Sequence, residues 1–364
     1  MGEYRKGKVG VIGCGKISEK YLATLTEKFH GILEVAACAD LVREMAEKRA
    51  AEFGIPKVCT VEEMLADPEI EFILNLTIPK AHASINLQAV QAGKHVYSEK
   101  PFTITLEEAN EVLGIAEEKG LRVGCAPDTF LGGGLQTCRK LIDDGWIGTP
   151  YAASGLLLGG NNNGVQPGDD PLMDMGPYWL TAFIFLLGPI REVCGYAKTF
   201  TREIKVANPH SPRYGQTVVN EAPTNVSGAI EFESGATALL QVARESFGYT
   251  PRLEVYGTEG ILHVPDPNFF RGPVLLMRHS GEIKEVPLTH GYTDENRGIG
   301  LADMVYAVRT GRPHRASGQL ARHVLEASRG LFAAEAARRH VRMQYPVERP
   351  EPLPLGVKFH ILDR

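Results

Sequence analysis

The sequence predicts an α/β protein with a doubly wound parallel sheet in its N-terminal domain. Its C-terminal domain is expected to be α+β, with an open-faced, mostly antiparallel or mixed sheet. Strands and helices alternate over the first third of the chain, which is typical of parallel sheets. After about Pro127, few helices separate the predicted strands. A length of 364 residues favours two domains. We expect them at residues 1–127 and 128–345, followed by a C-terminal tail at 346–364.

In the first domain, apolar segments that predict strands alternate with segments of helical spacing. The expected strands cover residues 9–12, 33–39, 58–59, 72–76, 95–98 and 122–126. Helices are expected at residues 17–29, 43–53 and 82–92. Two capping boxes, Thr60 with Glu63 and Thr105 with Glu108, predict two further helix starts.

The second domain begins with a predicted helix at residues 135–144. Its expected strands cover residues 151–158, 225–232, 236–244, 252–256, 260–264 and 275–278. Further helices are expected at residues 175–187, 301–309 and 319–338. The tail from residue 345 holds four prolines, so we expect it to wrap the surface.

Charge and composition argue against several classes of protein. Lys and Arg total 39 against 44 Asp and Glu, so no basic surface is expected for nucleic acid or a membrane. The longest apolar segment, residues 180–187, is far shorter than the ~18 residues that span a bilayer. The six cysteines form no CxxC pair and have no histidine at metal-ligand spacing. We therefore expect core cysteines in a reducing compartment, no metal site and a cytoplasmic protein.

A glycine-rich turn follows the first predicted strand. Gly13 and Gly15 belong to a GxGxxS pattern, in which Ser18 replaces the third glycine of the dinucleotide-binding fingerprint. The turn opens a helix, so the backbone at Gly13, Gly15, Lys16 and Ile17 is expected to bind a pyrophosphate. A strand, turn and helix without any ligand is the alternative interpretation.

Asp40 closes the second predicted strand, where a carboxylate can bind both hydroxyl groups of a ribose. Such a carboxylate would repel a 2′-phosphate, so we expect NAD as the cofactor rather than NADP. Arg43 and Lys16 favour NADP instead, because their positive charges would partly neutralise that phosphate. The alternative interpretation of Asp40 is a helix cap.

Three further motifs make the prediction more specific. The first is Thr77-Ile78-Pro79 with His82, the second is Glu99-Lys100-Pro101, and the third is Asp174-Met175-Gly176-Pro177-Tyr178. Together with the GxG turn, these motifs resemble the Gfo/Idh/MocA oxidoreductases over nearly the whole chain. The resemblance implies a Rossmann domain that binds NAD(P) and an open-faced sheet domain that carries the sugar and the oligomer contact.

The resemblance also implies roles for individual residues. It places Lys100 at the reacting carbinol and Asp174 beside the substrate. It places Thr77, Pro79, His82 and Glu99 with the cofactor. Tyr178 departs from the commoner DxGxH form, as in the glucose-fructose oxidoreductase and dihydrodiol dehydrogenase types, and this leaves the identity of the substrate open.

The chemistry of these side chains fits the oxidation of a carbinol. Asp174 and Tyr178 are four residues apart, so on one helix they would share a face. A phenol, whose ordinary pKa is ~10, is a poor base at neutral pH unless a cation lowers that pKa. Lys100 can supply the cation and can hydrogen-bond the substrate oxygen. We expect Tyr178 as the proton acceptor, Lys100 as its activator and Asp174 as an orienting group.

Weaker features leave two interpretations each. Asp128 and Thr129 end the last parallel strand and either touch the substrate or form a domain-linking turn. His82 either lines the site or supports a helix N-terminus. The Gly/Asn-rich loop at 159–168 either closes over a polyol or lies at the surface.

The sequence therefore predicts a hydride transfer between nicotinamide and a carbinol of a sugar, a sugar derivative or a cyclic polyol. Two alternatives remain. One is a transient-redox enzyme with tightly bound NAD, such as an epimerase or glycosidase, and the other is a non-catalytic, sugar-sensing co-repressor. Because the second sheet has helices on one face only, we expect a homodimer or homotetramer that uses strands 236–242 and 252–264.

Overall fold

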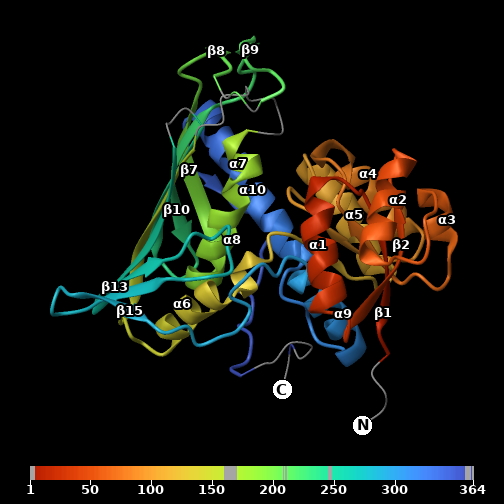
Figure 1. Ribbon diagram of the computed structural model, residues 1–364. Helices are drawn as coiled ribbons and strands as arrows, with labels where there is room; N and C mark the ends of the chain where they lie inside the picture. Colours follow the sequence, from red (N-terminus) through yellow and green to blue (C-terminus); the bar gives the residue numbers. More distant parts are fainter. Residues whose placement is uncertain are drawn as a thin grey trace. The chain divides into compact units, whose positions relative to one another are not determined.

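The computed structural model describes residues 5–159, 170–207, 209, 211–244, 248–356 and 362. These residues form two compact units (Figure 1). Unit 1 comprises the described parts of Met1–Gly133, His290–Arg322 and Pro350–Arg364. Unit 2 comprises the described parts of Gly134–Thr289 and His323–Arg349.

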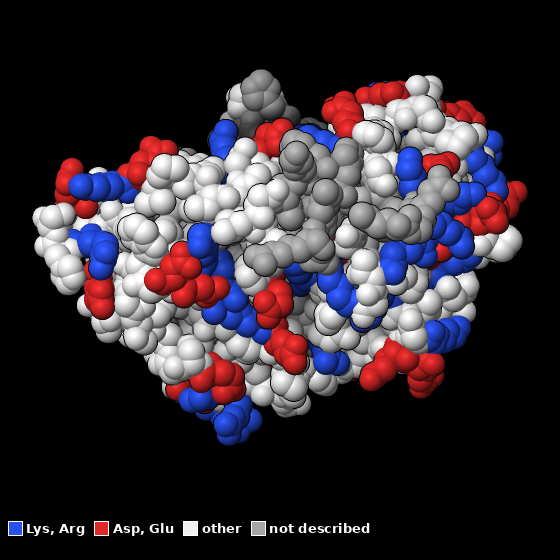
Figure 2. Space-filling view, turned by 90° about the horizontal axis from the view of Figure 1, so that it is seen from below, with Lys and Arg blue, Asp and Glu red and all other residues white. Residues whose placement is uncertain are grey.

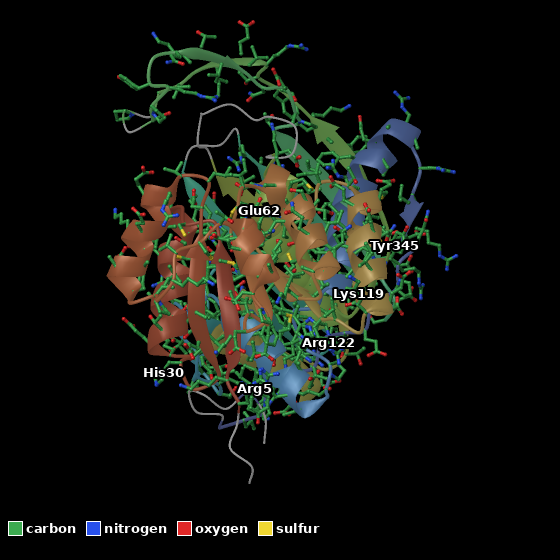
Figure 3. The ribbon with its side chains drawn as sticks, turned by 90° about the vertical axis from the view of Figure 1, so that its right-hand side faces the viewer. Arg5, His30, Glu62, Lys119, Arg122 and Tyr345 are labelled. Atoms are coloured by element: carbon green, nitrogen blue, oxygen red, sulfur yellow. The ribbon has the colours of Figure 1, made fainter. Side chains whose placement is uncertain are left out.

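Unit 1 is built on a five-stranded parallel sheet, which confirms the predicted doubly wound sheet. The strand order is β2-β1-β3-β4-β5. The strands are β1 (Gly7–Ile12), β2 (Leu33–Ala39), β3 (Phe72–Asn75), β4 (His95–Ser98) and β5 (Val123–Cys125). Arg5, His30 and Arg122 precede β1, β2 and β5, and all three lie toward the lower edge of the sheet in Figure 3. The loops that follow the strands leave from the opposite, carboxyl edge, where such sheets bind their ligands.

The helices of unit 1 include both that the capping boxes predicted. They are α1 (Lys16–Glu27), α2 (Arg43–Phe53), α3 (Val61–Ala66), α4 (Pro79–Gln91), α5 (Leu106–Glu118) and α9 (Ile299–Thr310). Thr60 caps α3 with Glu63, and Thr105 caps α5 with Glu108, each through a reciprocal pair of hydrogen bonds. The strand expected at residues 58–59 is wrong, because Val58 forms only an isolated bridge to Cys38.

The boundaries of unit 1 differ from the contiguous domains expected from the sequence. Residues 290–322, which the prediction assigned to the second domain, belong with the parallel sheet. Asp128 Oδ2 accepts the N–H groups of Gly298 at 2.8 Å and Gly300 at 3.0 Å, which ties the start of α9 to the end of the sheet. Arg315 Nε donates to the carbonyl oxygen of Glu351 at 3.1 Å, which ties the tail to the same unit.

Unit 2 is built on a mixed, mostly antiparallel sheet, as the sequence predicts, but with nine strands rather than the six expected. The order is β15-β14-β13-β12-β6-β11-β10-β7-β16, and among the neighbouring pairs whose register is known, only β6 with β11 is parallel. The strands are β6 (Pro150–Gly159), β7 (Ile190–Lys198), β10 (Asn225–Phe232), β11 (Thr237–Ala243), β12 (Tyr249–Gly257), β13 (Gly260–Val264), β14 (Val274–Met277), β15 (Ile283–Val286) and β16 (Val341–Arg342). A separate hairpin pairs β8 (Glu203–Lys205) with β9 (Thr217–Val219).

The core of unit 2 lies between this sheet and a helix that is apolar on every side. That helix, α8 (Gly176–Leu187), has all its residues buried. Gly155 on β6 allows the close approach, because a Cβ there would lie 2.8 Å from both Phe183 and Trp179. Helices α6 (Gly133–Asp143), α7 (Pro171–Asp174) and α10 (Gly318–Ala337) are the other helices of this part of the chain. Helices α6, α8 and α10 lie on one side of the sheet in Figure 1, and its other face lacks described helices.

The sequence analysis did not predict β7, whose polar side chains form ion pairs with residues outside the strand. Arg191 Nη1 donates to Glu231 at 3.0 Å, and Arg191 Nε donates to Glu233 at 3.2 Å. Neither partner lies on the same strand, so the pattern of β7 alone is too polar to indicate a strand.

Three general features concern the surface charges, the hydrophobicity of the helices and the cysteines. On the face shown in Figure 2, acidic and basic side chains are interspersed. No helix among the described residues is long and apolar enough to cross a membrane. All six cysteines are free thiols, and only Cys194 is not fully buried.

Candidate active site

The glycine-rich turn joins β1 to α1 and needs its first glycine for the fold. Gly13 has φ +98°, and a Cβ there would lie 2.6 Å from the backbone of Leu76. Gly15 differs, because a Cβ there would point into open space. Gly15 is also the N-cap of α1, and no side chain caps that helix. The turn therefore presents the open N-terminus of α1, beside the exposed Lys16 and half-buried Ile17, which suits an anionic group.

Ser18 replaces the third glycine of the fingerprint and is held by a residue that the sequence analysis missed. Its side chain is fully buried, and its Oγ donates to the carbonyl oxygen of Gly15 at 2.6 Å. Arg49 on α2 donates from Nε to the same Oγ at 3.2 Å. Arg49 also forms ion pairs with Glu19 and Glu52. The buried arginine thus joins α2 to the glycine-rich turn.

Asp40 follows β2 and fixes the same turn through backbone hydrogen bonds. Its Oδ2 accepts the N–H of Cys14 at 2.7 Å, and its Oδ1 accepts the N–H of Val42 at 2.9 Å. The side chain remains partly exposed. Arg43, the nearest cation in the sequence, donates to Glu47 at 2.8 Å.

His82 on α4 joins two loops at the carboxyl edge of the sheet. Its ring is 1% exposed, with Nδ1 2.6 Å from the carbonyl oxygen of Pro101 and Nε2 3.0 Å from that of Thr77. Thr77 is held further by Asn75, whose Oδ1 accepts from the Thr77 hydroxyl at 2.7 Å. Pro79 starts α4 at its first turn. These contacts give His82 and Pro79 structural roles, and their contact with a cofactor remains a prediction.

Glu99 and Lys100 follow β4, and the carboxylate of Glu99 is held from two sides. Glu99 is 8% exposed. Its Oε1 accepts from the hydroxyl of Tyr21 on α1 at 2.8 Å, and its Oε2 accepts from the backbone N–H of Lys100 at 2.9 Å. The sequence analysis did not identify Tyr21 as a site residue, since its partner lies 78 positions away.

Asp128 and Thr129 are both buried, at 1% and 2% exposure. The Asp128 carboxylate binds the start of α9, as described above, and Thr129 begins a short 3₁₀ helix. Burial raises the pKa of Asp128 to about 6, although the N–H groups of Gly300 and Gly298 act in the opposite direction. The observed contacts match the linking-turn interpretation, and a contact with substrate remains a prediction.

Asp174 and Tyr178 lie in unit 2, but they do not share a continuous helix, so that part of the prediction is wrong. Asp170 caps the short helix α7, which ends at Asp174, and α8 begins two residues later at Gly176. Met175, with φ −112° and ψ −25°, separates the two helices. The Tyr178 side chain is 7% exposed.

The carboxylate of Asp174 forms an ion pair with Arg244, at the end of β11. The two side chains border a cavity of about 410 Å³ in unit 2. Tyr249 borders it too, and donates from its hydroxyl to Asp266 at 2.7 Å. Burial, followed by this hydrogen bond, raises the pKa of Tyr249 well above its usual value. The cavity is lined by Leu157, Gly159, Pro171, Asp174, Met175, Val242, Ala243, Arg244, Gly248 and Tyr249.

Sequence reasoning missed Arg244, which ends a predicted strand, and Tyr249, which lies three residues before the next one, because neither has a motif around it. The remaining predicted residues divide between the units. The residues predicted to bind the cofactor, with Lys100, belong to unit 1, and Asp174 and Tyr178 belong to unit 2. Residues 160–168 of the predicted Gly/Asn-rich loop lie outside the described residues. Over the described part of the chain, no group of three His, Cys, Asp or Glu residues could hold a metal ion.

Two family descriptions match the chain in order. Residues 7–126 match the GFO_IDH_MocA oxidoreductase family with an NAD-binding Rossmann fold. Residues 135–263 match the GFO/IDH/MocA C-terminal domain.

Curated relatives and a solved structure resemble most of the chain. The 1,5-anhydro-D-fructose reductase of Ensifer adhaerens is 28% identical over 70% of this chain and 74% of its own. The scyllo-inositol 2-dehydrogenase (NAD(+)) of Bacillus subtilis (strain 168) is 27% identical over 71% of this chain and 73% of its own. A levoglucosan dehydrogenase, solved with NADH and levoglucosan, shares the fold with a TM-score of 0.80 and 20% identity, over 93% of this chain and 99% of that one.

Proposed function

Because the chain belongs to the Gfo/Idh/MocA oxidoreductase family, with both of its domains matched, we propose that it oxidises or reduces a carbinol of a neutral sugar or cyclic polyol with NAD. The relatives named as an anhydrosugar reductase and an inositol dehydrogenase support this class of substrate. The observation that carries the proposal is the open N-terminus of α1 at Gly15, on the same sheet edge as Lys100. A dinucleotide bound at that edge would lie on the same side of the sheet as the cationic side chain of Lys100.

The residues of the turn fit the pyrophosphate of such a cofactor. The space beside Gly15 is free of protein atoms within 4 Å of a Cβ, and the first turn of α1 has no side-chain cap. A phosphate oxygen would accept N–H groups at Lys16 and Ile17. When bound, the nicotinamide supplies the hydride acceptor of the oxidation.

The ribose end favours NAD over NADP. Asp40 is partly exposed, and its carboxylate would lie against a 2′-phosphate. Arg43 and Arg49, the two arginines nearest to it in the sequence, already form ion pairs with glutamates. The ion pair with Glu47 weakens the signal of Arg43 toward NADP, whereas the exposed Lys16 stays an opposing signal.

We assign the proton chemistry to Lys100, Tyr178 and Asp174. Lys100 would donate a hydrogen bond to the substrate oxygen and stabilise negative charge on it. Tyr178, deprotonated to the phenolate with Lys100 as its activating cation, would accept the hydroxyl proton. Asp174, paired with Arg244, would orient the substrate.

The cavity beside Asp174 supports a neutral substrate. Its volume of about 410 Å³ lies within the range of small-molecule sites and leaves room for one sugar ring. The charges of Asp174 and Arg244 compensate each other, so the pair brings no net charge to the cavity. A sugar acid would find no uncompensated cation in that pair.

The experiment is to incubate the protein with NAD or NADP and a panel of pyranoses, anhydrosugars, inositols and uronic acids. NADH absorbance and product mass are followed together. The proposal expects NADH and a product two mass units lighter, with a neutral substrate. A mass change without NADH would favour a transient-redox enzyme, and binding without turnover would favour a sensor, so either result contradicts the proposal.

A further inference from the structure

Tyr21 lies in the middle of α1 with a buried hydroxyl group that reaches the Glu99-Lys100 segment. Its side chain has no exposed surface, and its hydroxyl donates to Glu99 Oε1 at 2.8 Å. A hydrogen bond from a buried donor to a carboxylate is stronger than one between neutral groups. The contact therefore links two elements that are far apart in the sequence.

Glu99 has both carboxylate oxygens engaged, and the second one is bound to Lys100. Oε2 accepts the backbone N–H of Lys100 at 2.9 Å, and the backbone N–H of Glu99 donates to Asn75 at 2.9 Å. The backbone bond fixes Glu99 to the end of β3. The orientation of its carboxylate, and with it the hydrogen bond to Lys100, then depends on the Tyr21 hydroxyl.

The Tyr21 hydroxyl is held in its protonated form, which donates the hydrogen bond to Glu99. Burial, and next the negative charges of Glu99 and Asp128, raise the pKa of Tyr21 well above its usual value. The phenol therefore keeps its proton beside Glu99.

We propose that Tyr21 is a positioning residue for Lys100: its hydroxyl holds the Glu99 carboxylate, and that carboxylate fixes the backbone of Lys100. The inference rests on the proposed role of Lys100 at the substrate oxygen. Since Gly15 is the N-cap of α1, one helix would carry both the cofactor turn and the support of the lysine.

The chain offers a matched control in Tyr97. This second tyrosine of unit 1 is also fully buried, but its hydroxyl has no hydrogen-bond partner among the described residues. Tyr21→Phe and Tyr97→Phe each remove one buried hydroxyl and keep the ring. Any difference between them reports the contact with Glu99 rather than the loss of a hydroxyl as such.

The first test needs no substrate and measures hydrogen exchange of the Lys100 amide by mass spectrometry or NMR. Tyr21→Phe should speed this exchange by about tenfold or more, because the amide loses a well-oriented acceptor. Tyr97→Phe should leave it unchanged. Equal exchange in Tyr21→Phe and wild type would overturn the proposal.

The second test separates turnover from cofactor binding. Tyr21→Phe should lower kcat by roughly 10- to 100-fold, as expected for a misplaced catalytic group, and should change the Kd for NAD less than about twofold. The double variant Tyr21→Phe/Glu99→Gln should be no slower than Glu99→Gln alone, because both substitutions break one chain of contacts. Multiplying effects would show that Tyr21 does not act through Glu99.

The Lys100→Met variant distinguishes a failure of the proposed function from a failure of the positioning role of Tyr21. If Lys100→Met kept wild-type turnover, the role of Lys100 would be wrong, whereas the exchange test would still decide whether Tyr21 orders the Lys100 backbone. If Lys100→Met were inactive and Tyr21→Phe as active as Tyr97→Phe, only the positioning role would be lost.

Discussion

Single side chains carry most of the proposed chemistry. The role of the Tyr178 hydroxyl can be tested by removing that group alone. Tyr178→Phe keeps the buried ring and removes only the group that would accept the proton. We expect turnover to fall by roughly 10² to 10⁴ with little change in NAD binding. Lys100→Met should be at least as damaging, because it removes a cation and a hydrogen-bond donor.

Steady-state kinetics and NAD titration of both variants check this prediction. Near-normal turnover of Tyr178→Phe, together with complete loss in Asp174→Asn, would assign the base to Asp174 instead.

The shifted pKa of Asp128 predicts that its contribution to the free energy of unfolding depends on pH. Its pKa is about 6 in the folded protein, above the ordinary value of 3.8, because burial disfavours the charged form. The protonated carboxyl stabilises the fold below pH 4, and this contribution is lost as the pH rises through 6. The difference amounts to about 3 kcal/mol.

Chemical unfolding of wild type and Asp128→Asn from pH 4 to pH 7 measures that contribution. The wild type should lose stability relative to the variant as the pH rises. Parallel profiles would show that Asp128 does not titrate in this window.

At the scale of elements, we predict different roles for the two glycines of the β1-α1 turn, structural for Gly13 and cofactor binding for Gly15. Gly13→Ala should lower the free energy of unfolding by about 1–3 kcal/mol, because of its φ of +98° and its contact with Leu76. Gly15→Ala should fold normally, since its Cβ meets nothing within 4 Å, but should weaken NAD binding.

Thermal unfolding and calorimetric titration with NAD distinguish the two variants. Equal loss of NAD affinity in a well-folded Gly13→Ala and in Gly15→Ala would contradict this division of roles.

Local signals in the sequence predicted elements well, and long-range contacts explain the failures. The two capping boxes were correct because Thr60 with Glu63, and Thr105 with Glu108, are complete within four residues. The break between α7 and α8 at Met175 was missed, and Asp174, the last residue of α7, pairs with Arg244, 70 positions away. The placement of residues 290–322 depends on Asp128, which binds α9 from 170 positions away.

At the scale of the whole molecule, the bare face of the unit 2 sheet predicts self-association. Tyr196 and Leu239 lie on described strands of this sheet and are 69% and 65% exposed. Large exposed apolar side chains on one sheet face are typical of a protein interface. We predict a homodimer or homotetramer, and Leu239→Lys should reduce it to a monomer of ~40 kDa without unfolding it.

Light scattering coupled to size exclusion measures that state. A wild-type monomer at micromolar concentration would contradict the prediction, and circular dichroism of Leu239→Lys controls for unfolding.

The central claim is that the protein moves a hydride between a neutral carbinol and NAD with the help of Lys100. It is tested most directly with the best substrate of the panel, carrying deuterium on the reacting carbon, and mass spectrometry of the cofactor. Wild type should transfer one deuterium to the nicotinamide per turnover. Lys100→Met should transfer deuterium far more slowly than wild type. Turnover that leaves no deuterium on the cofactor, or equal transfer by Lys100→Met, would contradict the claim.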